Sequence, residues 1–311
     1  MMKNKLYLLQ KWVFGFLYVL LILTIIGCAT SDVAKKDSQN EKSLDPYDFD
    51  VYYNMGLSFA TSGNYRSAIE NFNKALQINP NSAKAYYNRG LAYYAIDSVI
   101  NGHSDFDTVL QIEPNNAEAY YNRGCGYDRI YGGHEKAFYD YNSAIRINPN
   151  YFDAYMKRGE SYQVYGKNYD KAIADYSEAL RINPNSASAY NSRGSLYRIK
   201  GDVDKAIVDF TLALNIDPNN FDSYNYRGIA YEKKRDFDKA ISDFSAALRI
   251  DPNNMWINVV YLNRGEAYFE KGDYQKAIAD YNTILRNNPN QTEVKKKLEV
   301  AKQRQLQQTW Q

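Results

Sequence analysis

A period of about 34 residues runs through most of this 311-residue chain and restricts the folds that it can adopt. The separations between successive prolines are 34, 34, 35, 35, 34, 34 and 37 residues, and the eight positions are Pro46, Pro80, Pro114, Pro149, Pro184, Pro218, Pro252 and Pro289. Glycines recur in step with them, at Gly56, Gly90, Gly124, Gly159, Gly194, Gly228 and Gly265. A fixed period of this length indicates helical hairpins that stack on one another.

The stretch 221–252 shows what one copy contains. Tyr224, Gly228 and Tyr231 have the i, i+4, i+7 spacing of a helix face, and a second set has the same spacing: Ala240, Phe244 and Ala247. Two short helices are therefore predicted. The small residues let the helices approach closely, and the final proline ends the second helix.

With this period, and with the order aromatic, Gly, Tyr, Ala, aromatic, Ala and Pro, the chain resembles the tetratricopeptide repeat (TPR) proteins over residues 49–291. The resemblance implies an all-α, right-handed solenoid of about seven hairpins, predicted at 49–82, 83–116, 117–151, 152–186, 187–220, 221–257 and 258–291. A capping helix is predicted at 292–311, where Val294, Leu298 and Ala301 have helical spacing among polar residues.

Four copies depart from the pattern, and in repeats three and four the departure is one extra residue in the hairpin turn. Repeat two has Gly102 where the other copies have alanine. Because glycine costs about 1 kcal/mol relative to alanine inside a helix, we expect a degenerate second helix that starts late or packs loosely. Repeat six ends in a three-residue insertion, which places Met255, Trp256 and Ile257 in an inter-repeat loop.

Residues 1–27 read as a signal peptide, with Lys3, Lys5 and Lys11 before an uncharged run at 12–26. Residues 24–28, TIIGC, also resemble the lipobox of bacterial lipoproteins, which implies cleavage before Cys28 and acylation of that cysteine. A flexible tether would follow at 28–48. The alternative is an uncleaved membrane helix, although 15 apolar residues fall short of the roughly 20 that span a bilayer.

Loss of residues 1–27 removes three lysines and changes the formal charge from +2 to −1. A near-neutral chain lacks the charge of a nucleic-acid-binding protein. His103 and His134 are predicted in hairpin turns, and Cys125 has no partnered histidine in the sequence around it. We therefore predict no catalytic residue, metal, cofactor or small-molecule substrate, and no enzymatic activity.

Six copies carry arginine directly before the glycine and aspartate before the second-helix aromatic. Antiparallel helices bring these two positions together, and the guanidinium matches a carboxylate in shape. We predict one structural ion pair within each repeat: Arg89–Asp105, Arg123–Asp140, Arg158–Asp175, Arg193–Asp209, Arg227–Asp243 and Arg264–Asp280. The alternative is two independent surface charges.

In the resembling family the first helix of each repeat lines a concave groove, which here contains Tyr53, Asn54, Tyr87, Asn88, Tyr94, Tyr121 and Asn122. The three asparagines fall at equivalent positions and can bond to the peptide groups of an extended ligand. The groove is therefore predicted to bind an extended polypeptide. The alternative is that asparagine is simply a favoured surface residue at this position.

The resemblance implies a membrane-anchored interaction scaffold of the bacterial cell envelope, similar to TPR lipoproteins that help assemble pili or outer-membrane proteins. Its partner would be a protein or extended peptide, and its anchor the acylated Cys28. Ala29, in place of the aspartate that signals inner-membrane retention, favours the outer membrane, facing the periplasm or the surface. Two alternatives remain: a self-assembling structural surface protein, and an adaptor held by an uncleaved helix.

Overall fold

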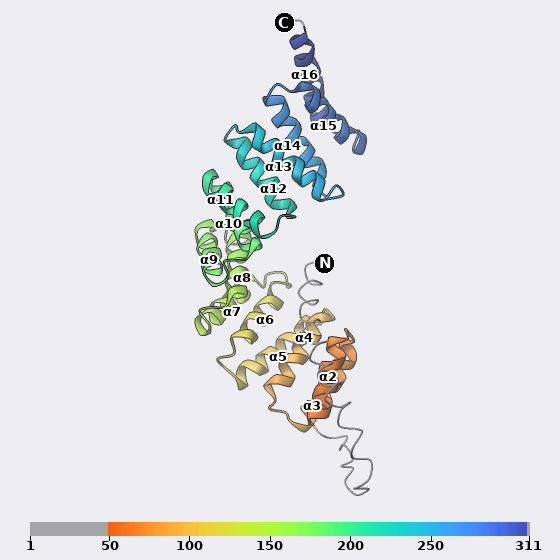
Figure 1. The fold of residues 1–311 in the computed structure, drawn as a ribbon. Coiled ribbons are helices and arrows are strands. Elements are labelled where there is room, and N and C mark those ends of the chain that lie inside the picture. Colours follow the sequence, from red (N-terminus) through yellow and green to blue (C-terminus); the bar gives the residue numbers. More distant parts are fainter. Residues whose placement is uncertain (1–48, 310–311) are drawn as a thin grey trace, which may run out of the picture. The chain divides into compact units, whose positions relative to one another are not determined.

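The computed structural model describes residues 49–309, so the predicted signal peptide, Cys28 and the tether lie outside the described residues. Within that range the chain forms fifteen α-helices and no β-strand, which confirms the all-α prediction (Figure 1). The helices divide into two compact units, one up to Ile130 and one from Tyr131 onward.

The first unit contains five of the helices: α2 (Phe49–Thr61), α3 (Tyr65–Ile78), α4 (Ala83–Ala95), α5 (Val99–Ile112) and α6 (Ala117–Tyr127). The second unit contains the other ten: α7 (His134–Ile147), α8 (Phe152–Val164), α9 (Tyr169–Ile182), α10 (Ala187–Lys200), α11 (Val203–Ile216), α12 (Phe221–Lys233), α13 (Phe237–Ile250), α14 (Ile257–Glu270), α15 (Tyr274–Asn287) and α16 (Thr292–Thr309). Helices α2 and α3, α4 and α5, and each pair from α8/α9 to α14/α15 pack as hairpins.

The periodic prolines determine where the second helices end. Six of these helices end at an isoleucine two residues before the proline: Ile78, Ile112, Ile147, Ile182, Ile216 and Ile250. The residue between each isoleucine and its proline is forced out of the helical conformation by the proline ring. An example is Asn183, where φ is −130° and ψ is 91°. After the turn, the side chain of Ser186 caps the next helix by accepting a hydrogen bond from the Ala189 N–H at 3.2 Å.

A glycine on the first helix of each hairpin faces an aromatic ring on the second. A methyl group placed on Gly228 would lie 2.7 Å from the fully buried ring of Phe244, and one on Gly265 would lie 2.7 Å from Tyr281. Such distances are shorter than real carbon contacts allow. The recurring glycines are therefore where the two helices of a hairpin come closest together.

Repeat two is regular, contrary to the prediction from Gly102. Helix α5 has 14 residues and begins at Val99, so the predicted late start is wrong. The predicted loose packing is also wrong, because a methyl group on Gly102 would lie 2.3 Å from the Tyr94 ring. The glycine makes room for this tyrosine.

The last helix packs on the final hairpin through one face. Its buried residues, Val294, Leu298 and Ala301, join a cluster with Tyr281 and Ile284 of α15. The remaining face of α16 is rich in lysine and glutamine and is exposed. Among the helices from α2 to α16, none has the length and apolar character needed to cross a membrane.

Candidate binding surfaces

The structure places the predicted arginine and aspartate partners in contact within the repeats. In repeat two, Nε and Nη2 of Arg89 donate to the Asp105 carboxylate at 2.8 and 2.6 Å. Four further pairs make the same two-point contact at 2.6–2.9 Å: Arg158–Asp175, Arg193–Asp209, Arg227–Asp243 and Arg264–Asp280. Arg123 and Asp140 belong to different units, so their pairing stays a prediction.

These five pairs are largely removed from solvent. The aspartate side chains are 4–7% exposed and the arginine side chains 16–19%. Hydrogen bonds to Asp209 raise the pKa of Arg193. Buried two-point pairs of this kind are expensive to break from one side, because the remaining charge has no substitute partner.

Each arginine also uses its third nitrogen, Nη1, to reach the repeat before it. Arg227 donates to Thr211 Oγ1 on α11 at 3.0 Å, and the other five do the same at 2.6–3.0 Å: Arg89 to Asn73, Arg123 to Asp107, Arg158 to Asn142, Arg193 to Ser177 and Arg264 to Ser245. The guanidinium thus joins its own hairpin to the preceding one. Sequence reasoning missed these acceptors, although an Asn, Asp, Ser or Thr recurs two residues after each predicted aspartate position.

In the first unit, tyrosine and asparagine side chains bond from one repeat to the next. Asn88 Nδ2 on α4 donates to the Tyr53 hydroxyl on α2 at 3.0 Å, and Asn122 Nδ2 on α6 donates to the Tyr87 hydroxyl on α4 at 2.9 Å. Tyr87 also donates to Glu118 at 3.2 Å. We call the surface formed by Tyr53, Asn88, Tyr87 and Asn122 the tyrosine–asparagine face.

The hydrogen bonds fix which atom of each asparagine is left for a ligand. Nδ2 of Asn88 also donates to the carbonyl oxygen of Lys84 at 2.8 Å, and Nδ2 of Asn122 to that of Glu118 at 2.8 Å. A backbone carbonyl can only accept, which assigns the nitrogen and oxygen of both amides. Among the described residues nothing donates to either Oδ1 atom, so both oxygens remain as acceptors.

Other predicted groove residues lie in varied surroundings. Asn54 is exposed on α2, and Tyr121 is half-buried on α6. The rings of Tyr53 and Tyr87 pack on Phe72 and Phe106 at centroid distances of 5.9 and 5.6 Å. The Tyr53 ring also stacks on Phe49, with ring centroids 5.6 Å apart.

Tyr94, another predicted groove residue, is half-buried and packs against buried aromatic side chains. Its ring packs against Phe106 at a centroid distance of 5.3 Å and edge-on to His103 at 5.6 Å, in the layer between α4 and α5. Gly102 and Gly126 provide the space, since a methyl group on Gly126 would lie 2.2 Å from the Tyr94 hydroxyl. The spacing of residues along α4 could not predict this position of the Tyr94 ring, because the two glycines that leave room for it belong to α5 and α6.

The histidines are helical, which corrects the prediction of turn positions. His103 is buried in α5 and stacks on Tyr127 with ring centroids 4.1 Å apart. His134 is the first residue of α7 and stacks on Tyr165. Cys125 is half-buried on α6. Within residues 49–309, no group of three potential metal ligands comes together.

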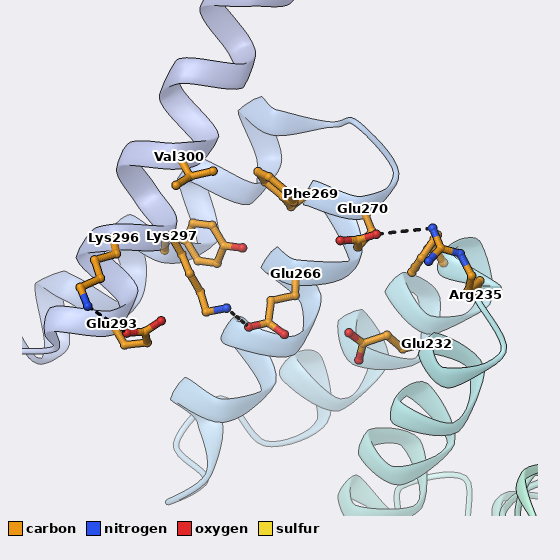
Figure 2. Close-up of a pocket in the computed structure, with 11 residues that line it drawn as sticks. Glu232, Arg235, Glu266, Phe269, Glu270, Glu293, Lys296, Lys297 and Val300 are labelled. Carbon is orange, nitrogen blue, oxygen red and sulfur yellow. Dashed lines mark ion pairs between the residues drawn. The ribbon is translucent and has the colours of Figure 1, made fainter.

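A pocket of about 530 Å³ lies between α12, α14 and α16 of the second unit (Figure 2). Phe237, Phe269 and Val300 contribute its apolar lining. Three of its four glutamates have a cationic partner, at N–O distances of 2.9, 3.5 and 3.7 Å: Glu266–Lys297, Glu270–Arg235 and Glu293–Lys296. The fourth, Glu232, has no cation within ion-pair distance among the described residues.

The surroundings of Glu232 disfavour its charged form. Burial, together with the nearby charges of Glu266 and Glu270, raises the pKa of Glu232 to about 7, and the positive charge of Lys297 opposes this shift only in part. Sequence reasoning missed this cluster because its carboxylates belong to different repeats. One signal in the sequence could have indicated Glu232. The fourth residue after the recurring first-helix glycine varies between copies, and it is a glutamate only in repeat six.

Family models of the TPR repeat match residues 56–97, 164–198 and 194–234, and models of the tetratricopeptide repeat match 221–254 and 259–291. No curated protein sequence matches the chain. Among solved structures, the C-terminal part of a TPR repeat-containing protein from Cytophaga hutchinsonii is 21% identical, with a TM-score of 0.65; the match covers 78% of this chain and 97% of the other.

Two further structures are similar over a shorter stretch. MamA is 29% identical with a TM-score of 0.50, over 55% of this chain and 92% of its own. YrrB, described as a TPR protein with an unusual peptide-binding site, is 23% identical with a TM-score of 0.52. The match covers 60% of this chain and 95% of YrrB. Together the family models cover more than half of the 311 residues. The chain therefore belongs to the tetratricopeptide repeat proteins.

Proposed function

We propose that this TPR protein is a non-enzymatic, membrane-anchored scaffold of the bacterial cell envelope, and that its tyrosine–asparagine face binds an extended polypeptide. The TPR fold is typical of interaction proteins rather than enzymes. The observation that carries the proposal is the pair of amides held at equivalent positions on α4 and α6, each with its Oδ1 atom left to accept a hydrogen bond.

The fixed orientation of these amides favours binding to a peptide backbone. An extended chain presents N–H groups at regular intervals, and each can donate to an asparagine oxygen. Because the amides are already held by tyrosine hydroxyls and backbone carbonyls, little side-chain entropy is lost on binding. The description of YrrB as a peptide-binding TPR protein is a precedent within the fold.

Replacing both Asn88 and Asn122 by alanine is expected to weaken partner binding roughly tenfold, since each lost hydrogen bond is worth about 0.5–1.5 kcal/mol. A photo-reactive residue at the exposed Asn54 position would measure this as the yield of crosslinked partner in intact cells. The matched control changes Asn81 and Asn115, which are exposed in the inter-repeat turns. Equal crosslink yields from the double variant and the control would contradict the proposal.

The anchor is proposed from residues 24–28 of the sequence. A lipoprotein that carries two or more acyl chains is held stably, at about 0.8 kcal/mol per buried CH₂, whereas one chain holds only marginally. Attachment at Cys28, with a polar segment before α2, would leave the repeats free to meet partners at the membrane surface.

Replacing Cys28 by serine is expected to abolish incorporation of radioactive palmitate and to leave the signal peptide uncleaved. Gel mobility and palmitate labelling in growing cells measure both effects. Cys125→Ser is the control, because this cysteine lies on α6 and should leave labelling unchanged. Full labelling of the Cys28→Ser protein would rule out the lipoprotein anchor.

A further inference from the structure

The pocket between α12, α14 and α16 has one carboxylate more than it has cations. Its three ion pairs account for Glu266, Glu270 and Glu293, and only the half-buried Glu232 is left over. Figure 2 shows Glu232 on α12, Glu266 and Glu270 on α14, and Lys296 and Lys297 on α16. When Glu232 is ionised, the pocket therefore has a single unmatched negative charge.

The position of Glu232 is unfavourable for the protein alone. The Glu232 carboxylate on α12 is repelled by Glu266 and Glu270 on α14, and partial burial makes this repulsion between like charges stronger. Such local conflicts between sequence and stability are expected at functional sites. A bound cation would remove this repulsion by neutralising the charge of Glu232, the one carboxylate of the three that lacks an ion-pair partner.

The apolar lining restricts what kind of cation would fit. Phe237, Phe269 and Val300 line the pocket together with the carboxylates, and Val300 belongs to α16. An aliphatic stem that carries a charged head matches this combination, because the stem packs on the rings while the head meets the carboxylate. The volume of about 530 Å³ lies within the range of roughly 300–1,000 Å³ that is usual for ligand pockets.

We propose that this pocket binds a lysine or arginine side chain of a polypeptide partner, with Glu232 as the carboxylate that receives it. The proposal rests on the proposed function as a polypeptide-binding scaffold, but it concerns a separate site in the second unit. Helices α12 and α14 are first helices of their repeats, as are α4 and α6, which carry the tyrosine–asparagine face. A basic residue entering the pocket would fix the register of a bound segment.

The test uses the full chain in a nonionic detergent and two blocked pentapeptides, Ac-Ala-Ala-Lys-Ala-Ala-amide and its glutamine analogue. NMR titration at pH 8 is expected to show the lysine peptide binding at least about tenfold more tightly. A cation favours the ionised carboxylate, so bound peptide lowers the pKa of Glu232, which is about 7 in the free protein. The preference for lysine should therefore shrink as the pH falls from 8 to 6.

Glu232→Gln is expected to abolish both the preference and its pH dependence. The same change should raise the urea midpoint at pH 8, because it removes the like-charge repulsion without changing side-chain size. Glu299→Gln is the matched control, since Glu299 is exposed on α16, pairs with Lys302 at 2.7 Å and does not line the pocket. That control should change neither quantity.

Three results would overturn the proposal: equal affinity of the native protein for both peptides, an undiminished lysine preference in Glu232→Gln, or a lower urea midpoint in that variant. These outcomes are separate from those of the Asn88 and Asn122 experiment. If the Asn88 and Asn122 experiment supports partner binding but the protein shows no preference for the lysine peptide, only the pocket proposal is contradicted. If the protein prefers the lysine peptide but the Asn88 and Asn122 replacements leave the crosslink yield unchanged, only the proposal for the tyrosine–asparagine face is contradicted.

Discussion

Replacing Arg227 by methionine is expected to lower the free energy of unfolding by about 3–5 kcal/mol. Methionine keeps much of the side-chain volume but leaves Asp243, which is 7% exposed in the native protein, without the two hydrogen bonds that compensate its burial. It also removes the 3.0 Å bond to Thr211 that joins α12 to α11. Urea denaturation followed by circular dichroism would measure the change.

Two further variants separate the ion pair from general loss of charge. Lys239→Met removes an exposed pair with Asp236 on the same repeat and should cost no more than about 1 kcal/mol. Adding Asp243→Leu to Arg227→Met should restore much of the lost stability, because an apolar replacement of both partners leaves no buried charge. A cost below 1 kcal/mol for Arg227→Met would show that the pair adds little to the stack.

The bond to Thr211 makes the effect extend across a repeat boundary. Stability in a solenoid is a sum of terms within each repeat and terms between neighbours. Arg227 contributes to both, through Asp243 in its own hairpin and Thr211 in the preceding one. We therefore expect amide hydrogen exchange in Arg227→Met to speed up on α11 as well as on α12 and α13.

Contacts within one hairpin could be predicted from the sequence because they recur in step with the period. Arg227 and Asp243 lie 16 residues apart on antiparallel helices, and the same types return in five other copies. The glycine that faces Phe244 is recognisable for the same reason. These features need only the geometry of one hairpin, which short-range spacing determines.

Contacts between repeats could not be predicted in the same way. The bond from Arg227 to Thr211 and the grouping of Glu232 with Glu266 depend on how one hairpin is rotated against the next. Helical spacing fixes which face a residue lies on, but not which residue of the neighbouring repeat it meets. The hydroxyl partners of Asn88 and Asn122 were missed for this reason, although the asparagines themselves were identified.

Restoring the usual alanine in repeat two is expected to destabilise the protein. Gly102→Ala gains about 1 kcal/mol of helix propensity, yet its methyl group would lie 2.3 Å from the Tyr94 ring and 3.1 Å from the Gly90 carbonyl oxygen. Overpacking of a filled site costs about 1–3 kcal/mol, and displacing the ring also disturbs its contacts with His103 and Phe106. We expect a net loss of about 2 kcal/mol in the free energy of unfolding.

Tyr94 and Gly102 thus form a compensating pair, and a double-mutant cycle can demonstrate it. Tyr94→Ala alone should be destabilising because it opens a cavity beside Phe106. Adding Gly102→Ala to it should then be stabilising, since the new methyl group enters space that the ring has left and the helix gains its propensity. The sign of the Gly102→Ala effect would therefore reverse between the two backgrounds. A stabilising effect in both would show instead that Gly102 is only a weak point in α5, as its sequence first indicated.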